Sequence, residues 1–213
     1  MKITKNNILP WTLFWLLLTT FTESPAEEIP VISSEKSTNS RFVRIGQETK
    51  SKGLITSPTP VSCVFDNKTS LIWEVKTRDR GLRDARQSYS WYDSNAKSNG
   101  GFQGYRNRGK CAFSSCDTDT YISYVNKIKL CGRSDWRLPA REELRSLVDY
   151  QVTYPGPTID QNAFPNTISQ FYWSATANAN DKETAWGIGF SFGYDYAYFK
   201  SDHGYIRLVS GPK

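Results

Sequence analysis

Hydrophobic and polar residues alternate most regularly near the C-terminal end of the chain. On either side of Gly193, apolar and aromatic side chains recur at every second position: Trp186, Ile188, Phe190 and Phe192, then Tyr194, Tyr196 and Tyr198. A period of two places such side chains on one face of a β-strand. The pattern predicts two strands here, and residues 205–209 predict a closing strand.

A β-hairpin is predicted much earlier in the chain. Residues 61–65 and 70–74 have the composition of strands, and the four polar residues between them are of types that turns favour. The preceding stretch is polar and low in aromatic residues. Regular structure is therefore expected to begin near Val61.

A period near 3.6 predicts a helix over residues 117–130. Its apolar face has three members: Tyr121, Val125 and Ile128. Asp117 or Thr118 can cap its start, and Gly132 suits a left-handed stop after its end.

A second helix is predicted over residues 139–150. Pro139 suits the first helical position, and Glu142 and Glu143 fall in the first turn, where acidic groups favour the helix dipole. The apolar stripe of this helix has three members: Leu144, Leu147 and Val148.

The other segments are irregular. Residues 76–110 are poor in aliphatic side chains, and residues 151–171 carry three prolines. The fold class expected is α+β, with two helices packed on antiparallel strands and long irregular loops. We place the domain at residues 41–213, after a flexible lead-in over residues 27–40.

Composition excludes several classes of protein. Aromatic residues make up 14% of the 213 residues, which is too rich for a disordered chain. The single histidine, His203, rules out a centre built on two histidines, and no glycine-rich phosphate loop is present. No cofactor and no metal are expected.

The N-terminus has the pattern of an export signal. Lys2 and Lys5 precede an apolar stretch at residues 8–21, and small residues end at Ala26. We predict a signal peptide over residues 1–26. The alternative is a retained anchor, but the stretch is shorter than the ~20 residues of a spanning helix. No later segment is apolar enough to span a membrane, so the mature protein is expected in the periplasm, on the outer surface or secreted.

Export changes the interpretation of the four cysteines, which are Cys63, Cys111, Cys116 and Cys131. An even number in an oxidising compartment favours two disulfides over the alternative of a zinc site. A helix over residues 117–130 would separate Cys116 from Cys131 by roughly 20 Å, beyond the ~7 Å that a disulfide spans. Two pairings remain, and we prefer Cys111–Cys116 with Cys63–Cys131, because Cys111 and Cys116 are close in sequence.

One motif is far more specific than these patterns. Residues 131–139 read C-G-R-S-D-W-R-L-P and are followed by Glu142, Glu143 and Leu144. This stretch resembles the signature of the Lcl C-terminal domain family, named for a bacterial collagen-like adhesin. Other landmarks of that family occur in the same order, at residues 66–73, 159–166, 172–176, 186–190 and 206–209. The resemblance covers about residues 41–211.

The resemblance implies a C-type-lectin-like fold in a secreted or surface protein of bacteria. The domain of the founding adhesin is associated with sulfated glycans and host surfaces. Many members carry a cysteine pair at the positions that match Val125 and Leu208 here. Both partners are absent together, so we expect an apolar contact in place of that bridge.

The W-R-L-P motif carries charges that could be mistaken for a catalytic acid–base cluster. A guanidinium that forms a bidentate hydrogen bond to a carboxylate can also hold a loop against the start of a helix. We assign the motif to structure, with these residues: Asp135, Trp136, Arg137, Leu138, Pro139 and Glu143.

Basic side chains form two runs. The first is diluted by Asp79 and Asp84: Lys76, Arg78, Arg80, Arg83 and Arg86. The second, Arg106, Arg108 and Lys110, is undiluted and suits an anionic glycan, unless it is only a solvated loop. Nucleic acid is not expected as a partner of an exported protein.

The tyrosine strand supplies further candidate contacts: Tyr194, Asp195, Tyr196, Tyr198 and Lys200. Tyrosine gives a large contact area at low entropic cost, although alternate rings can equally pack in a core. Catalysis has little support, because Ser174 and Ser191 have no evident base except His203. Formylglycine-generating enzymes have a related lectin-like fold, but their chemistry uses a C-terminal cysteine pair, and this chain has no cysteine after Cys131. The sequence also lacks the Glu-Pro-Asn, Gln-Pro-Asp and Trp-Asn-Asp triplets of calcium-dependent sugar-binding lectins.

The sequence therefore predicts a non-catalytic recognition module, of which an adhesin is one kind, for an anionic glycan or a protein partner at the cell surface. The alternative from another class is a structural subunit of an envelope or appendage assembly, and a hydrolase is the weakest hypothesis. No pattern in the sequence sets the oligomeric state.

Overall fold

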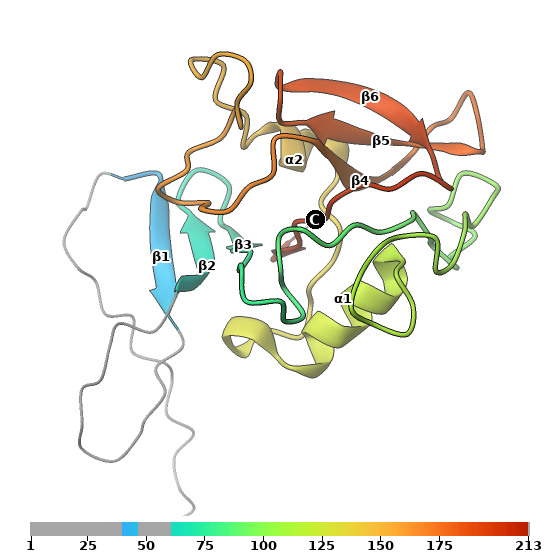
Figure 1. Ribbon diagram of the computed structural model, residues 1–213, viewed down its shortest axis with the longest axis horizontal. Helices are drawn as coiled ribbons and strands as arrows, with labels where there is room; N and C mark the ends of the chain where they lie inside the picture. The colour runs from blue at the N-terminus through green and yellow to red at the C-terminus, as the bar shows by residue number, and fades with distance from the viewer. Residues whose placement is uncertain (1–39, 47–60, 213) are drawn as a thin grey trace, which may run out of the picture. The chain divides into compact units, whose positions relative to one another are not determined.

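The computed structural model describes residues 40–46 and 61–212 (Figure 1). Apart from Ser40, the predicted signal peptide and lead-in lie outside these residues. The elements, in chain order, are β1 (Phe42–Gly46), β2 (Val61–Asp66), β3 (Leu71–Glu74), α1 (Thr118–Lys127), a 3₁₀ turn (Leu130–Gly132), α2 (Arg141–Arg145), β4 (Phe171–Ala177), β5 (Thr184–Gly189), β6 (Tyr194–Phe199) and β7 (Val209–Ser210).

The strands form two antiparallel sheets, with the orders β1-β2-β3-β7 and β4-β5-β6. This arrangement confirms the α+β class. No helix in the described ranges is long and apolar enough to cross a membrane.

The predicted hairpin is present as β2 and β3, with Cys63 opposite Glu74. Asp66 organises its turn, since its carboxylate accepts hydrogen bonds from the backbone N–H of Lys68 and the hydroxyl of Thr69. Regular structure begins earlier than predicted, because β1 pairs with β2. A two-pronged bond from Arg41 to Asp66, at 3.0 and 2.7 Å, ties the start of β1 to this turn.

The closing strand is shorter than predicted, because the chain changes partner along residues 205–209. Tyr205 bridges to Tyr172 of β4, whereas Val209 pairs with Trp73 of β3. The segment therefore crosses from one sheet to the other and forms a regular strand only at β7. The predicted strand ending at Phe192 is also shorter, since β5 stops at Gly189 before a turn.

Both helices are shorter than predicted. Asp117 caps the start of α1 by accepting a hydrogen bond from the N–H of Thr120 at 2.9 Å. At the other end, Lys129 and Cys131 have left-handed backbone conformations, so the helix stops and residues 130–132 form a separate 3₁₀ turn. The second helix has five residues and its cap is Ala140, so Pro139 precedes it. It cannot extend, because Val148 and Asp149 pair with the chain at residues 158–159.

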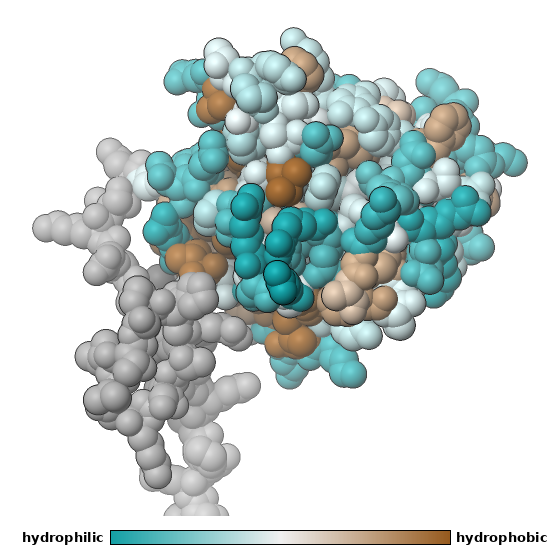
Figure 2. Space-filling view, in the orientation of Figure 1, coloured by the Kyte–Doolittle hydropathy of each residue, from teal (hydrophilic) through white to brown (hydrophobic). Residues whose placement is uncertain are grey.

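The long segment at residues 76–110 has no helix or strand but is built into the core. Tyr89 and Trp91 are buried, and the indole N–H of Trp91 donates to the carbonyl of Ser174 at 2.9 Å. In the view of Figure 2, hydrophilic side chains cover much of the described surface, and hydrophobic ones show as separate patches.

The disulfides are Cys63–Cys131 and Cys111–Cys116, which is the preferred pairing. Val125 and Leu208 are both fully buried in one core cluster that also holds Cys63, as expected for an apolar replacement of the missing bridge.

Candidate functional site

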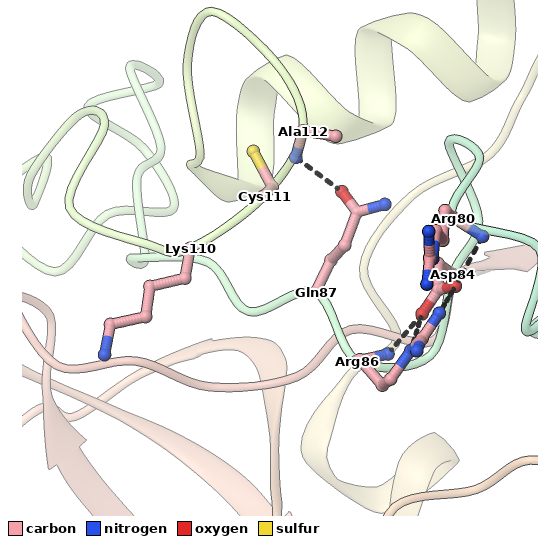
Figure 3. A pocket seen from close by; sticks show the side chains of 7 residues that line it. All are labelled: Arg80, Asp84, Arg86, Gln87, Lys110, Cys111 and Ala112. Atoms are coloured by element: carbon pink, nitrogen blue, oxygen red, sulfur yellow. Dashed lines mark hydrogen bonds and ion pairs between the residues drawn. The ribbon is translucent and has the colours of Figure 1, made fainter.

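A shallow hollow of about 410 Å³ opens between two segments of the long irregular region (Figure 3). Its lining is rich in cations and consists of Arg80, Asp84, Arg86, Gln87, Lys110, Cys111 and Ala112. The hollow therefore joins part of the first basic run to the last member of the second.

Backbone pairing holds the two segments together. Ser88 and Lys110 exchange both hydrogen bonds, at 2.9 and 2.8 Å. The Cys111–Cys116 disulfide closes the loop directly after Lys110. These links fix the backbone on both sides of the hollow.

Asp84 organises the cationic side. Its buried carboxylate accepts two bonds from the guanidinium of Arg86, at 2.9 and 2.6 Å, and one from the backbone N–H of Arg80 at 2.7 Å. These hydrogen bonds, with that of Arg86 the strongest influence, hold the pKa of Asp84 well below its usual range. The carboxylate thus stays ionised and neutralises one cation.

Gln87 lies between the two basic sides. Its amide oxygen accepts from the N–H of Ala112 at 3.3 Å, and its amide nitrogen donates to the carbonyl of Gly81 at 2.5 Å. Figure 3 shows its side chain between Lys110 on one side and Arg80 and Arg86 on the other. The Gln87 amide therefore supports the wall of the hollow.

Two cations of the lining have no partner among the described residues. In the described part of the chain, neither the Arg80 guanidinium nor the Lys110 ammonium makes a hydrogen bond or ion pair. Three cations and one carboxylate line the hollow, so its net charge is +2. Arg80 and Lys110 lie on opposite sides of Gln87 in the lining (Figure 3).

The other members of the second basic run lie outside this hollow. The Arg106 guanidinium lies 4.2 Å from the ring centre of Tyr92, and that of Arg108 lies 4.4 Å from the ring centre of Tyr105. Both side chains are exposed, and Arg106 is also 4.0 Å from the carboxylate of Asp119. Lys110 thus lines the same hollow as Arg80 and Arg86, on the other side of Gln87, whereas Arg106 and Arg108 lie outside it.

The first basic run divides between the interior and the surface. Lys76 is buried against Glu74, and Arg83 donates to the carbonyls of Ser62 and Val75. The sequence does not single out Arg80 and Arg86 as contacts, because Asp79 and Asp84 interrupt the basic run that contains them. Asp84 and Arg86 are two residues apart and pair with each other. That spacing is the sequence signal that could have distinguished the paired Arg86 from Arg80, whose guanidinium pairs with no described residue.

The tyrosine strand is β6, and its rings have different surroundings. Tyr196 and Tyr198 lean on Phe171 of β4, at ring-centre distances of 5.1 and 4.2 Å. Tyr194 is 65% exposed and lies parallel to Phe192. No hydrogen bond, ion pair or ring contact joins Arg106, Arg108 or Lys110 to β6 within the described ranges.

Lys200 corrects one expectation. The sequence predicts a binding contact at this residue, but its side chain is fully buried, and its Nζ donates to the carbonyls of Asn99 and Phe102 at 2.8 and 2.6 Å. The ammonium also lies 4.5 Å from the ring centre of Trp91. Its place is therefore beneath the loop rather than on the surface.

The W-R-L-P motif forms a junction between a loop and α2. Arg137 makes a two-pronged bond to Glu143 at 2.7 and 2.8 Å, and the same carboxylate accepts from the N–H of Ala140. Trp136 is buried and donates to the carbonyl of Leu130, while Asp135 accepts from Arg133 and Ser210. Leu138 and Pro139 are buried beside them.

The serines considered for catalysis are not arranged around His203. The Ser174 hydroxyl is buried and donates to the carbonyl of Trp186 at 2.7 Å. His203 is exposed, and over residues 40–46 and 61–212 no hydrogen bond or ion pair connects it to a serine or a carboxylate.

A second hollow, of about 440 Å³, has the opposite character. Glu142 and Glu143 contribute to its lining, with Thr69, Leu71, Ser146 and Pro212. It offers no cation to an acidic ligand, so the basic hollow is the better site for an anion.

Comparison with known families adds to this geometry. A family model described as the Lcl C-terminal domain matches residues 62–210, which is most of the chain. The chain belongs to the Lcl C-terminal domain family. Membership indicates a surface-associated domain. In this Lcl C-terminal domain, the match includes the hairpin, both disulfides and the basic hollow. A search of curated proteins gave no match.

Proposed function

We propose that this protein is an exported, non-catalytic recognition module with a C-type-lectin-like fold, which binds acidic glycans through the basic hollow. The observation that carries the proposal is the pair of uncommitted cations, Arg80 and Lys110, beside a carboxylate already neutralised by Arg86.

The chemistry of the lining suits sulfate or carboxylate groups on a sugar. A guanidinium presents a planar fork that matches such anions, and an ammonium adds a compact charge. The volume of about 410 Å³ lies within the roughly 300–1,000 Å³ typical of ligand sites. One or two sugar units are therefore a reasonable ligand, with Arg106 and Arg108 available to a longer chain.

Export is part of the proposal. Two disulfides are typical of proteins that mature in an oxidising compartment. The predicted signal peptide agrees with that route, to the periplasm, the outer surface or the medium.

A structural subunit of an envelope or appendage assembly is the second candidate. It is favoured by three exposed rings that stack nearly in parallel, Tyr154, Phe192 and Tyr194. Such a patch is typical of a contact with another protein. A protein partner at the cell surface would use this patch, whereas an acidic glycan would use the basic hollow.

A glycan array at low and high salt tests the proposed function. We expect binding to sulfated or uronic-acid glycans that weakens as salt rises, since exposed charges are screened. Binding confined to neutral glycans, or no binding to acidic ones, would contradict the proposal. In the second case, capture of an envelope protein that depends on Tyr194 would favour the structural subunit.

A further inference from the structure

The second sheet ends in an open edge. Its order is β4-β5-β6, so β6 pairs on one side only, and Figure 1 shows it as the outermost strand of that sheet. Edge strands expose backbone groups that can pair with another chain.

The register identifies which groups face outward. The N–H of Lys200 donates to the carbonyl of Glu183, the residue before β5. In an antiparallel pair, every second residue is hydrogen-bonded to the neighbouring strand. Tyr198, Tyr196 and Tyr194 are therefore the residues of β6 that bond to β5. The N–H and C=O of Asp195 and Ala197 therefore point away from the sheet. No other described segment supplies them with a hydrogen bond.

The tyrosine rings leave this edge clear. Tyr196 and Tyr198 lean across β5 toward Phe171 of β4. Glycine at position 189 makes room for this, because a Cβ there would lie 2.5 Å from the Tyr196 hydroxyl. The rings thus cover the face of the sheet and not the edge of β6.

The edge also carries few of the usual features that prevent strand addition. The sequence of β6 is Tyr-Asp-Tyr-Ala-Tyr-Phe, with no proline and no basic side chain, and its pairing with β5 has no bulge. Native edges commonly carry one of these features. Asp195 is its only charge, and Arg141 lies 3.5 Å from that carboxylate.

The strand is complementary to a second copy of itself. An antiparallel arrangement about a two-fold axis at Tyr196 sets Asp195 opposite the second copy's Ala197, and Tyr194 opposite the second copy's Tyr198. The outward groups of Asp195 and Ala197 then exchange four hydrogen bonds. This register does not use Phe199, whose carbonyl already accepts from the N–H of Asp202. A parallel, in-register pair would instead set the two Asp195 carboxylates side by side.

We propose that β6 is a self-association surface, through which two copies of the chain join their second sheets into one continuous antiparallel sheet. The tyrosines of both copies then form a single row on one face. The proposal does not depend on the basic hollow.

The size of the contact sets its strength. Tyr194 and Tyr198, which this pairing sets opposite each other, are 65% and 37% exposed. At about 150–250 Å² per ring, they contribute roughly 150–260 Å² per copy before the backbone is counted, against about 800 Å² in a standard stable interface. The dimer is therefore reversible and depends on protein concentration.

Sedimentation of the full-length protein, expressed so that both disulfides form, tests this inference over about a hundredfold range of concentration. We expect the weight-average mass to rise toward twice that of the monomer. Ala197→Pro should abolish this rise, because it removes the outward N–H and leaves the bonds to β5 intact. Ala197→Thr is the matched control, since it keeps the N–H and should dimerise like the wild type.

Amide hydrogen exchange on the wild type gives an answer even if Ala197→Pro fails to fold. The amides of Asp195 and Ala197 should be protected at high concentration and exposed on dilution. A monomer at every concentration, or a folded Ala197→Pro variant that still dimerises, would overturn the proposal. Protection that appears only on adding a strand-forming peptide would assign the edge to a foreign strand and also overturn it.

Discussion

The Nζ atom of Lys76 lies 3.1 Å from Oε1 of Glu74, and both side chains are almost completely buried. Tyr121 completes the contact, because its hydroxyl lies 2.7 Å from Nζ and donates to the same carboxylate oxygen. Arg207, also buried, donates to the backbone carbonyl of Glu74 at 2.7 Å. One carboxylate therefore balances two buried cations where β3 meets α1 and the final segment.

This arrangement makes Glu74 harder to replace than Lys76. Glu74→Gln leaves two cations buried without a carboxylate, and we expect it to lower the free energy of unfolding by about 3–5 kcal/mol. Lys76→Met removes one buried charge and keeps the volume, so its cost should be smaller. Urea unfolding of both variants checks the order. An equal or larger loss in Lys76→Met would contradict this account of the cluster.

The same cluster predicts a dependence of stability on pH. Burial lowers the pKa of Lys76 to about 8, from 10.5 in its ordinary state, although Glu74 opposes the shift. Between these values the unfolded chain holds more protons than the folded one, so this group adds stability as pH rises. From about pH 7 to about pH 10, the unfolding free energy of the wild type should gain on that of Lys76→Met, by up to roughly 3 kcal/mol. A difference that stays flat over this range would show that Lys76 does not titrate there.

The two disulfides should contribute unequally to stability. Cys63 and Cys131 are separated by 68 residues, and Cys111 and Cys116 by 5. Loop-closure entropy gives about 4 kcal/mol for the first and about 2 kcal/mol for the second. Replacing each pair with alanine and measuring unfolding free energies tests this order. Only loss of Cys111–Cys116 should also weaken anion binding, since that bridge adjoins Lys110.

Arg106 and Arg108 allow a further test of the binding surface. Because both stand over tyrosine rings outside the hollow, reversing their charges together should weaken binding to a short acidic glycan by less than about threefold. A longer acidic chain should show a larger effect. A severe loss with the short ligand would move the site away from the hollow toward Tyr92 and Tyr105.

Local patterns in the sequence predicted the parts of the fold that depend on near neighbours. The hairpin of β2 and β3 follows from alternation and a polar turn. The predicted helix between Cys116 and Cys131 excludes a disulfide between those two, and closeness in sequence favours Cys111–Cys116 among the pairings that remain. The ends of the helices could not be predicted in this way, because tertiary contacts determine where each helix stops. Val148 and Asp149 pair with residues 158–159 and stop α2, which no periodicity in the helix reveals.

The candidate site was predictable only in part, for the same reason. The undiluted basic run predicted a contact at Lys110, which lines the hollow, but equally local evidence predicted a contact at Lys200, which is buried. Whether a cation faces a ligand depends on whether the fold supplies it with carbonyls or carboxylates. Lys200 meets two carbonyls inside the loop, whereas the Arg80 guanidinium meets none in the described chain.

The most direct test of the account compares two charge-reversed proteins in calorimetric titrations with a sulfated oligosaccharide at low salt. Arg80→Glu with Lys110→Glu removes the uncommitted cations and keeps the backbone bond from Arg80 to Asp84. Lys97→Glu with Lys182→Glu makes the same change in net charge at exposed positions outside the hollow. We predict that the first pair lowers affinity at least tenfold, about 1.4 kcal/mol, and that the control pair changes it by less than about twofold. Equal losses in the two proteins, or no loss in the first, would contradict binding at the basic hollow.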